Sequence, residues 1–93
     1  MNVTGYNRYT PMGYEAIVPT TAKKLTVPKG AKYALITVEV QHVRMTDDGT
    51  TATALVGIQL KVTDPPLWYA GNLSTVSLFN DTAGGLVKVL YYS

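Results

Sequence analysis

The sequence predicts an all-β protein: a single-domain antiparallel β-sandwich of the jelly-roll type, with an extended N-terminal arm. Residues 33–41 alternate between apolar and polar side chains, as the residues of a half-buried strand do. Turn sequences recur along the whole chain and separate about eight β-prone segments. The one helix candidate, residues 50–56, is short and rich in β-branched threonine. An immunoglobulin-like sandwich is the alternative, but the chain has no cysteine and so lacks the disulfide of that fold.

The arm is predicted over residues 1–14 and the sandwich domain over residues 15–93. Residues 1–14 contain Gly5, Pro11, Gly13 and three tyrosines, and they show neither helical nor strand periodicity. Disordered tails contain few aromatic residues, so this segment is expected to pack on something. We expect it to lie on a neighbouring protein surface rather than on its own sandwich.

Five strands are expected to be short. Each ends at a turn or a proline, and they cover residues 15–18, 24–27, 57–62, 67–70 and 75–79. The turn at 28–30 reads Pro-Lys-Gly. Asp48-Gly49 forms another turn, because glycine accepts a positive φ angle there. Residues 80–85 end in two glycines and form a flexible turn before the last strand.

Residues 33–41 form the clearest strand. Its inward face is expected to consist of alternate apolar residues: Ala34, Ile36, Val38 and Val40. After His42 the apolar positions change phase, to Val43 and Met45. This change indicates a bulge, or a bend at which the chain passes to the other sheet.

Residues 86–92 form the last strand, and both of its faces are apolar. The two faces are Val87, Val89 and Tyr91 on one side and Leu86, Leu90 and Tyr92 on the other. One face of a strand in a two-layer sandwich is normally wet, so we expect another subunit to cover the outer face. A chain this short also has a thin core, which favours a homo-oligomer, with a trimer as the preferred state.

The composition excludes several classes of protein. Without cysteine there are no disulfides and no thiolate metal ligands. The net charge is only +2 and the basic residues are scattered, so no specific nucleic-acid binding is expected. No apolar run approaches the ~20 residues of a membrane span, and the N-terminus lacks the apolar core of a signal peptide. We therefore expect a soluble protein that is made in a cytoplasm and has no membrane partner.

No residue pattern indicates catalysis, a cofactor or a metal. His42 is the only histidine, and no cysteine or recognisable serine nucleophile accompanies it. Asp47 and Asp48 could begin a calcium loop, but the acidic spacing and closing glutamate of an EF-hand are missing, so a turn is favoured. We expect no enzymatic activity and no catalytic, cofactor-binding or metal-binding residues.

Aromatic side chains point to an interface. Trp68 and Tyr69 could begin a platform for sugars, but neighbours on a strand point to opposite faces and cannot stack on one ligand. Aromatic and arginine side chains also anchor protein–protein interfaces, and this use is favoured. The candidate interface residues are Tyr6, Arg8, Tyr9, Tyr14, Trp68, Leu86, Leu90 and Tyr92.

Several short motifs follow one another in a specific order. They are Pro28-Lys29-Gly30-Ala31, Tyr33-Ala34, Val43-Arg44-Met45-Thr46-Asp47-Asp48-Gly49-Thr50, Thr53-Ala54, Gly57, Leu73-Ser74 and Val89-Leu90-Tyr91-Tyr92. In this order, over residues 25–92, the chain resembles small proteins that are encoded among the structural genes of tailed bacteriophages.

The resemblance implies a component of the virion without catalytic residues. We expect a capsid decoration or cement protein that binds the assembled head as an oligomer, with the major capsid protein or another virion protein as its partner. One alternative is a head-fibre, tail or adaptor subunit of the virion. The alternative from another class is a carbohydrate-binding β-sandwich module.

Overall fold

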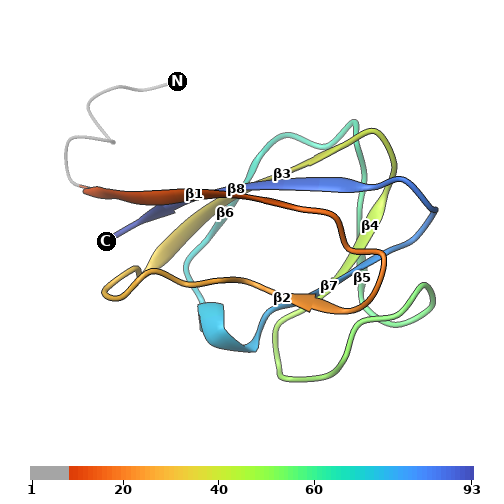
Figure 1. The fold of residues 1–93 in the computed structure, drawn as a ribbon, viewed down its shortest axis with the longest axis horizontal. Coiled ribbons are helices and arrows are strands. Elements are labelled where there is room, and N and C mark those ends of the chain that lie inside the picture. Colours follow the sequence, from red (N-terminus) through yellow and green to blue (C-terminus); the bar gives the residue numbers. More distant parts are fainter. Residues whose placement is uncertain (1–8) are drawn as a thin grey trace.

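The computed structural model describes residues 9–93. They form two antiparallel sheets that pack face to face (Figure 1), which confirms the predicted all-β sandwich. The elements are β1 (Pro11–Ile17), β2 (Lys23–Lys24), β3 (Tyr33–Glu39), β4 (Val43–Thr46), β5 (Ile58–Leu60), β6 (Leu67–Tyr69), the 3-10 helix η1 (Leu73–Thr75), β7 (Ser77–Asn80) and β8 (Leu86–Tyr92). Over the described residues, no helix is long and apolar enough to span a membrane.

The strands pair like a long hairpin that has been folded over on itself. β1 pairs with β8, β2 with β7, β3 with β6, and β4 with β5, all antiparallel. Further pairing of β3 with β8 and of β4 with β7 joins these pairs into two sheets. Their strand orders are β1-β8-β3-β6 and β2-β7-β4-β5. This nesting of strand pairs is the predicted jelly-roll arrangement.

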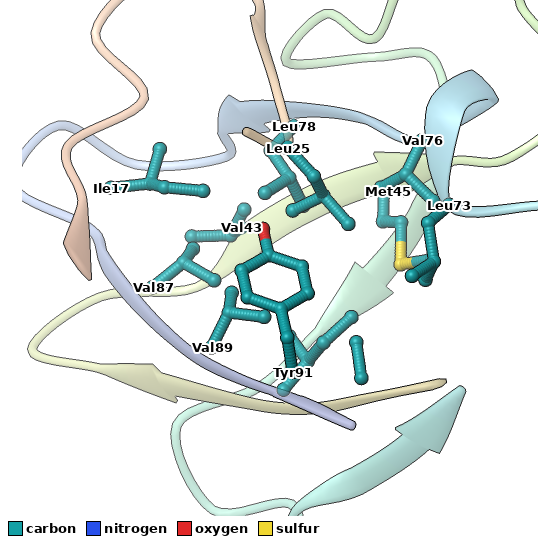
Figure 2. Close-up of a cluster of buried hydrophobic side chains, with 12 residues drawn as sticks. Ile17, Leu25, Val43, Met45, Leu73, Val76, Leu78, Val87, Val89 and Tyr91 are labelled. Carbon is teal, nitrogen blue, oxygen red and sulfur yellow. The ribbon is translucent and has the colours of Figure 1, made fainter. Parts of the chain in front are cut away.

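The core lies between the two sheets and is built from alternate residues of the strands. Val87, Val89 and Tyr91 of β8 are at most 1% exposed, so the predicted inner face of this strand is confirmed. Ile36 is also buried, whereas Val38 is only half-buried at the margin of the core. Figure 2 shows the Tyr91 ring standing among aliphatic side chains that come from both sheets.

The chain passes from one sheet to the other between β3 and β4, as the change of phase predicted. Val43 and Met45 are buried in the second sheet. Val40 was expected on the inward face of β3, and this expectation is wrong. The strand ends at Glu39, Val40 adopts a φ of +74°, and its side chain is 68% exposed. The reversal that carries the chain across the sandwich takes Val40 out of the alternation.

The Asp-Gly turn after β4 is confirmed. Gly49 has a φ of +90°, and the backbone N–H of Thr50 donates a 3.0 Å hydrogen bond to the Asp48 carboxylate. The β-prone residues that follow this turn form no strand. Instead Ala52 is buried, and its N–H donates a 3.0 Å hydrogen bond to the Ser77 hydroxyl of β7. Residues 50–56 therefore cover part of the outer side of the second sheet.

The described part of the expected arm belongs to the sandwich. β1 begins at Pro11, so residues 11–14 pair with β8, and Thr10 and Ser93 exchange backbone hydrogen bonds of 3.1 and 2.9 Å. The expectation that this segment packs away from its own domain is wrong for residues 9–14. The free edge of β8 offers a row of backbone partners that is satisfied without another chain.

Candidate interaction surface

One face of the β1-β8-β3-β6 sheet points away from the core and carries a continuous apolar row. Leu35 of β3 lies opposite Trp68 of β6 on one side and opposite Leu90 of β8 on the other. Leu90 in turn lies opposite Tyr14 of β1. Directly opposed residues in a sheet share a face, so this row crosses all four strands. Tyr14 is 60% exposed and Leu90 is 41% exposed.

A cluster of four aromatic rings adjoins this row. Tyr33 and Tyr92 lie opposite each other in the sheet, and the rings of Tyr33 and Trp68 stack at 5.5 Å with an interplanar angle of 18°. Tyr9 meets Tyr33 edge-on at 5.1 Å and Trp68 at 5.0 Å. Trp68 and Tyr92 are 5.4 Å apart at 45°. Such edge-on and stacked contacts make a rigid aromatic surface. We call the row and the cluster together the aromatic face: Tyr9, Tyr14, Tyr33, Leu35, Trp68, Leu90 and Tyr92.

The polarity of this side of the sheet changes along the strands. Beyond Leu90, Lys88 of β8 forms a 3.3 Å ion pair with Glu39 of β3. Leu86 lies opposite Glu39 at this charged end. The surface thus has an apolar, aromatic centre and a charged margin, which is the composition typical of protein–protein interfaces.

Beneath this surface, a hydrogen bond fixes the edge strand β1 against the core. The hydroxyl of buried Tyr91 donates to the Glu15 carboxylate at 2.6 Å, and the same carboxylate oxygen accepts the Thr26 N–H at 3.0 Å. Burial raises the pKa of Tyr91 above its ordinary value of 10.0, and the Glu15 carboxylate raises it further. The neutral phenol therefore persists as a donor, and it holds β1 in the position that presents Tyr14.

The structure gathers the described interface candidates on one side of one sheet. Tyr9, Tyr14, Trp68, Leu90 and Tyr92 lie in the aromatic face, and Leu86 lies at its charged margin. Tyr6 and Arg8 fall outside the described residues.

The sequence reasoning missed Tyr33 and Leu35. Both are half-buried in the aromatic face. The sequence contains a signal for them, because they share the odd-numbered phase of Thr37 and Glu39 and so lie on the side of the strand opposite the predicted inward face. Their apolar character at outward positions extends the apolar surface of this sheet.

Arg44, Gln59, Asp81 and His42 make side-chain hydrogen bonds that link strands and loops of the second sheet. Arg44 of β4 donates to Asp81 at 3.2 Å and to the Gly57 carbonyl at 3.1 Å, and Gln59 donates to Asp81 at 2.5 Å. Nδ1 of His42 accepts the Val62 N–H at 3.2 Å, which engages the histidine in a loop contact. Within residues 9–93, no three histidine or carboxylate side chains come together as metal ligands.

Comparison with protein-family models, with curated proteins and with solved structures finds no match to this chain.

Proposed function

We propose that this protein is a structural component of a bacteriophage virion, a capsid decoration or cement protein that binds the assembled head through its aromatic face. The observation that carries this proposal is the apolar row of Trp68, Leu35, Leu90 and Tyr14, which crosses an entire sheet, with a charged pair beside it further along β8 and β3. Soluble monomers seldom expose contiguous apolar patches of this kind except at sites of interaction.

The jelly-roll fold supports the proposal without deciding it. Jelly rolls occur in viral capsid proteins and also in lectins and cupins, so the fold alone does not assign a function. The cupin chemistry requires a cluster of metal ligands, and residues 9–93 contain none. Protein binding and sugar binding are the two activities that an aromatic surface on this fold can perform.

The ring packing favours a protein partner over a sugar. A sugar stacks on the open, flat face of an aromatic ring. In the aromatic face, Tyr33 and Trp68 turn ring faces toward each other, and Tyr9 stands edge-on to both. The rings thus pack on one another into one apolar cluster, and aromatic clusters of this kind anchor protein–protein interfaces.

Mass spectrometry of purified particles tests the proposal. A decoration protein is expected in a copy number that scales with the coat subunits. A few copies per particle would replace it by the head-fibre, tail or adaptor role, and absence from the particles would refute a virion role. In the last case, a glycan-array signal that Trp68→Ala abolishes would establish the carbohydrate-binding alternative.

A pair of leucine variants tests the surface itself. Leu90→Lys places a charge in the middle of the aromatic face, whereas Leu55→Lys makes the same change at an 89% exposed site in the segment that covers the other sheet. Each variant is added to particles that lack the protein, and the bound fraction is measured by sedimentation. We expect Leu55→Lys to bind like wild type and Leu90→Lys to lose binding by at least about tenfold. Equal binding of the two variants would exclude the aromatic face.

A further inference from the structure

A groove of about 430 Å³ opens along the side of the sandwich where β5 and β6 lie. These strands are the end members of their respective sheets, so each has one edge without a neighbouring strand among residues 9–93. The groove is lined by apolar groups of Met45, Ile58, Leu67 and Tyr69. Ile58 is 63% exposed although it lies opposite buried Met45 in the sheet, so the core is open to solvent at this edge.

Among residues 9–93, the charged residues that line the groove are two aspartates. Asp47 and Asp48 follow the end of β4. Asp47 accepts a 3.1 Å hydrogen bond from the Tyr69 hydroxyl. Hydrogen bonds from the side chain and backbone of Thr50 hold the pKa of Asp48 below its ordinary value of 3.8, so this carboxylate is ionised at neutral pH. An apolar floor that leads to two carboxylates is the complement of a lysine side chain, which has an apolar stem and a charged head.

The opposite edge of the same sheet offers such side chains. β2 ends the β2-β7-β4-β5 sheet and consists of Lys23 and Lys24, both exposed. Lys23 lies opposite Leu78, whose side chain is in the core, so Lys23 projects along the margin of the core side of the sheet. Lys24 lies opposite Ser77 and projects from the outer side. One edge of this sheet is therefore basic, and the other borders an acidic groove.

We propose that the protein self-associates head to tail, with Lys23 of the β2 edge of one copy seated in the Asp47–Asp48 groove of the next and Lys24 adding positive charge beside it. Two β2 edges repel each other through their lysines, and two grooves repel each other through their aspartates, so only the unlike pair attracts. Like charges that face each other across an interface destabilise it. The charges therefore select the head-to-tail contact over contacts between two edges or two grooves, and they also strengthen the head-to-tail contact.

Head-to-tail contacts have a geometric consequence. Each copy contributes one groove and one β2 edge, so the interface is heterologous and its closed product is a ring rather than a two-fold dimer. The trimer favoured on sequence grounds is such a ring. The inference does not rest on the proposed function, because the aromatic face and the groove share no residue.

A charge-swap experiment tests the inference by sedimentation velocity of the full-length chain. The first variant is Lys23→Glu/Lys24→Glu, and its matched control, Lys29→Glu/Lys32→Glu, makes the same change in net charge at exposed lysines of the loop before β3. We expect wild type and control to associate and the first variant to associate at least about tenfold more weakly. Wild-type association should also weaken from about 0.01 M to about 0.15 M salt, as the screening length falls from ~30 to ~8 Å.

The reciprocal variant gives the decisive result. Asp47→Lys/Asp48→Lys reverses the groove, and it should be as defective alone as the β2 variant. Mixing the two variants places an acidic edge against a basic groove and a basic edge against an acidic groove, so association should return. The restored complexes must alternate the two variants, so their closed rings hold an even number of copies. A wild-type protein that is monomeric at all concentrations and salts, or association that the β2 variant leaves unchanged, would overturn the inference. Circular dichroism checks the fold of each variant, and the exposed β2 lysines keep the test valid if the groove variant does not fold.

Discussion

The two sheets of this sandwich share one core, but their outer faces differ in how their side chains are satisfied. On the β2-β7-β4-β5 sheet, Arg44 and Gln59 bond to Asp81, and residues 50–56 cover Ser77. On the β1-β8-β3-β6 sheet, apolar residues cross all four strands, and Leu90 and Tyr14 reach the solvent.

This difference is the basis on which we propose the aromatic face as the surface that binds a partner. A charged network and a covering loop stabilise the outer side of the second sheet within the chain itself. The apolar groups of the aromatic face are partly in water. Covering them with another protein would contribute about 25 cal/mol of binding free energy per Å² of buried apolar surface. The following substitutions break or sharpen this contrast.

The largest effect is expected in the core, on which both outer faces depend. Val89 is fully buried in β8, between the two sheets. Val89→Asp should prevent folding, because an unpaired carboxylate cannot be accommodated there. Val89→Ala should lower the free energy of unfolding by about 1–3 kcal/mol, through lost burial and the cavity that remains. Urea denaturation measures both, and an unchanged midpoint for Val89→Ala would contradict the assigned core.

The next effect concerns the hydrogen bond that holds β1 beneath the aromatic face. Tyr91→Phe removes the donor to Glu15 and should cost about 1–2 kcal/mol near neutral pH. The folded-state pKa of Tyr91 is raised, so its contribution is complete below the unfolded value of about 10 and is lost at higher pH. Wild type should therefore lose stability above about pH 10 more steeply than Tyr91→Phe does. Parallel urea curves of the two proteins up to pH 11 would disprove this assignment.

A smaller effect is expected on the charged outer face. Arg44→Ala removes one hydrogen bond to the Asp81 carboxylate, but the hydrogen bond from Gln59 remains. We therefore expect a loss of stability smaller than that of Val89→Ala. The hydrogen bond from Gln59, followed by that from Arg44, keeps the pKa of Asp81 below its ordinary 3.8. A lowered pKa stabilises the fold above the unfolded value, so the difference between wild type and Arg44→Ala should shrink as the pH falls below 3.8. Thermal melts at pH 3 and pH 7 measure this difference.

The smallest effect on stability is expected on the aromatic face. Leu90→Lys replaces a 41% exposed side chain and should change the free energy of unfolding by no more than about 0.5 kcal/mol. A surface that serves only a partner can lose binding without losing stability. If Leu90→Lys instead destabilises the isolated protein as strongly as Val89→Ala, the residue belongs to the core and the contrast between the two faces fails.

The sequence predicted best the elements whose apolar residues alternate along the whole element. The last strand covers residues 86–92 as predicted, because its alternation of buried and outward residues runs through the whole element. The second strand is shorter than predicted: β2 ends at Lys24, and Leu25 is buried in the core instead of continuing the pairing with β7. Residues 50–56 form no strand despite their β-branched threonines. Instead, the backbone N–H of Ala52 donates a hydrogen bond to the Ser77 hydroxyl.

The amino-acid sequence by itself determined which residues alternate along each strand, and therefore which side chains share a face. It also supplied most of the aromatic residues from which we propose an interaction surface. Only the tertiary structure decided that Tyr14 lies opposite Leu90 and that Leu35 joins Leu90 to Trp68. Alternation is a property of neighbouring residues, whereas register between the two ends of a chain depends on how the whole sandwich closes around its core.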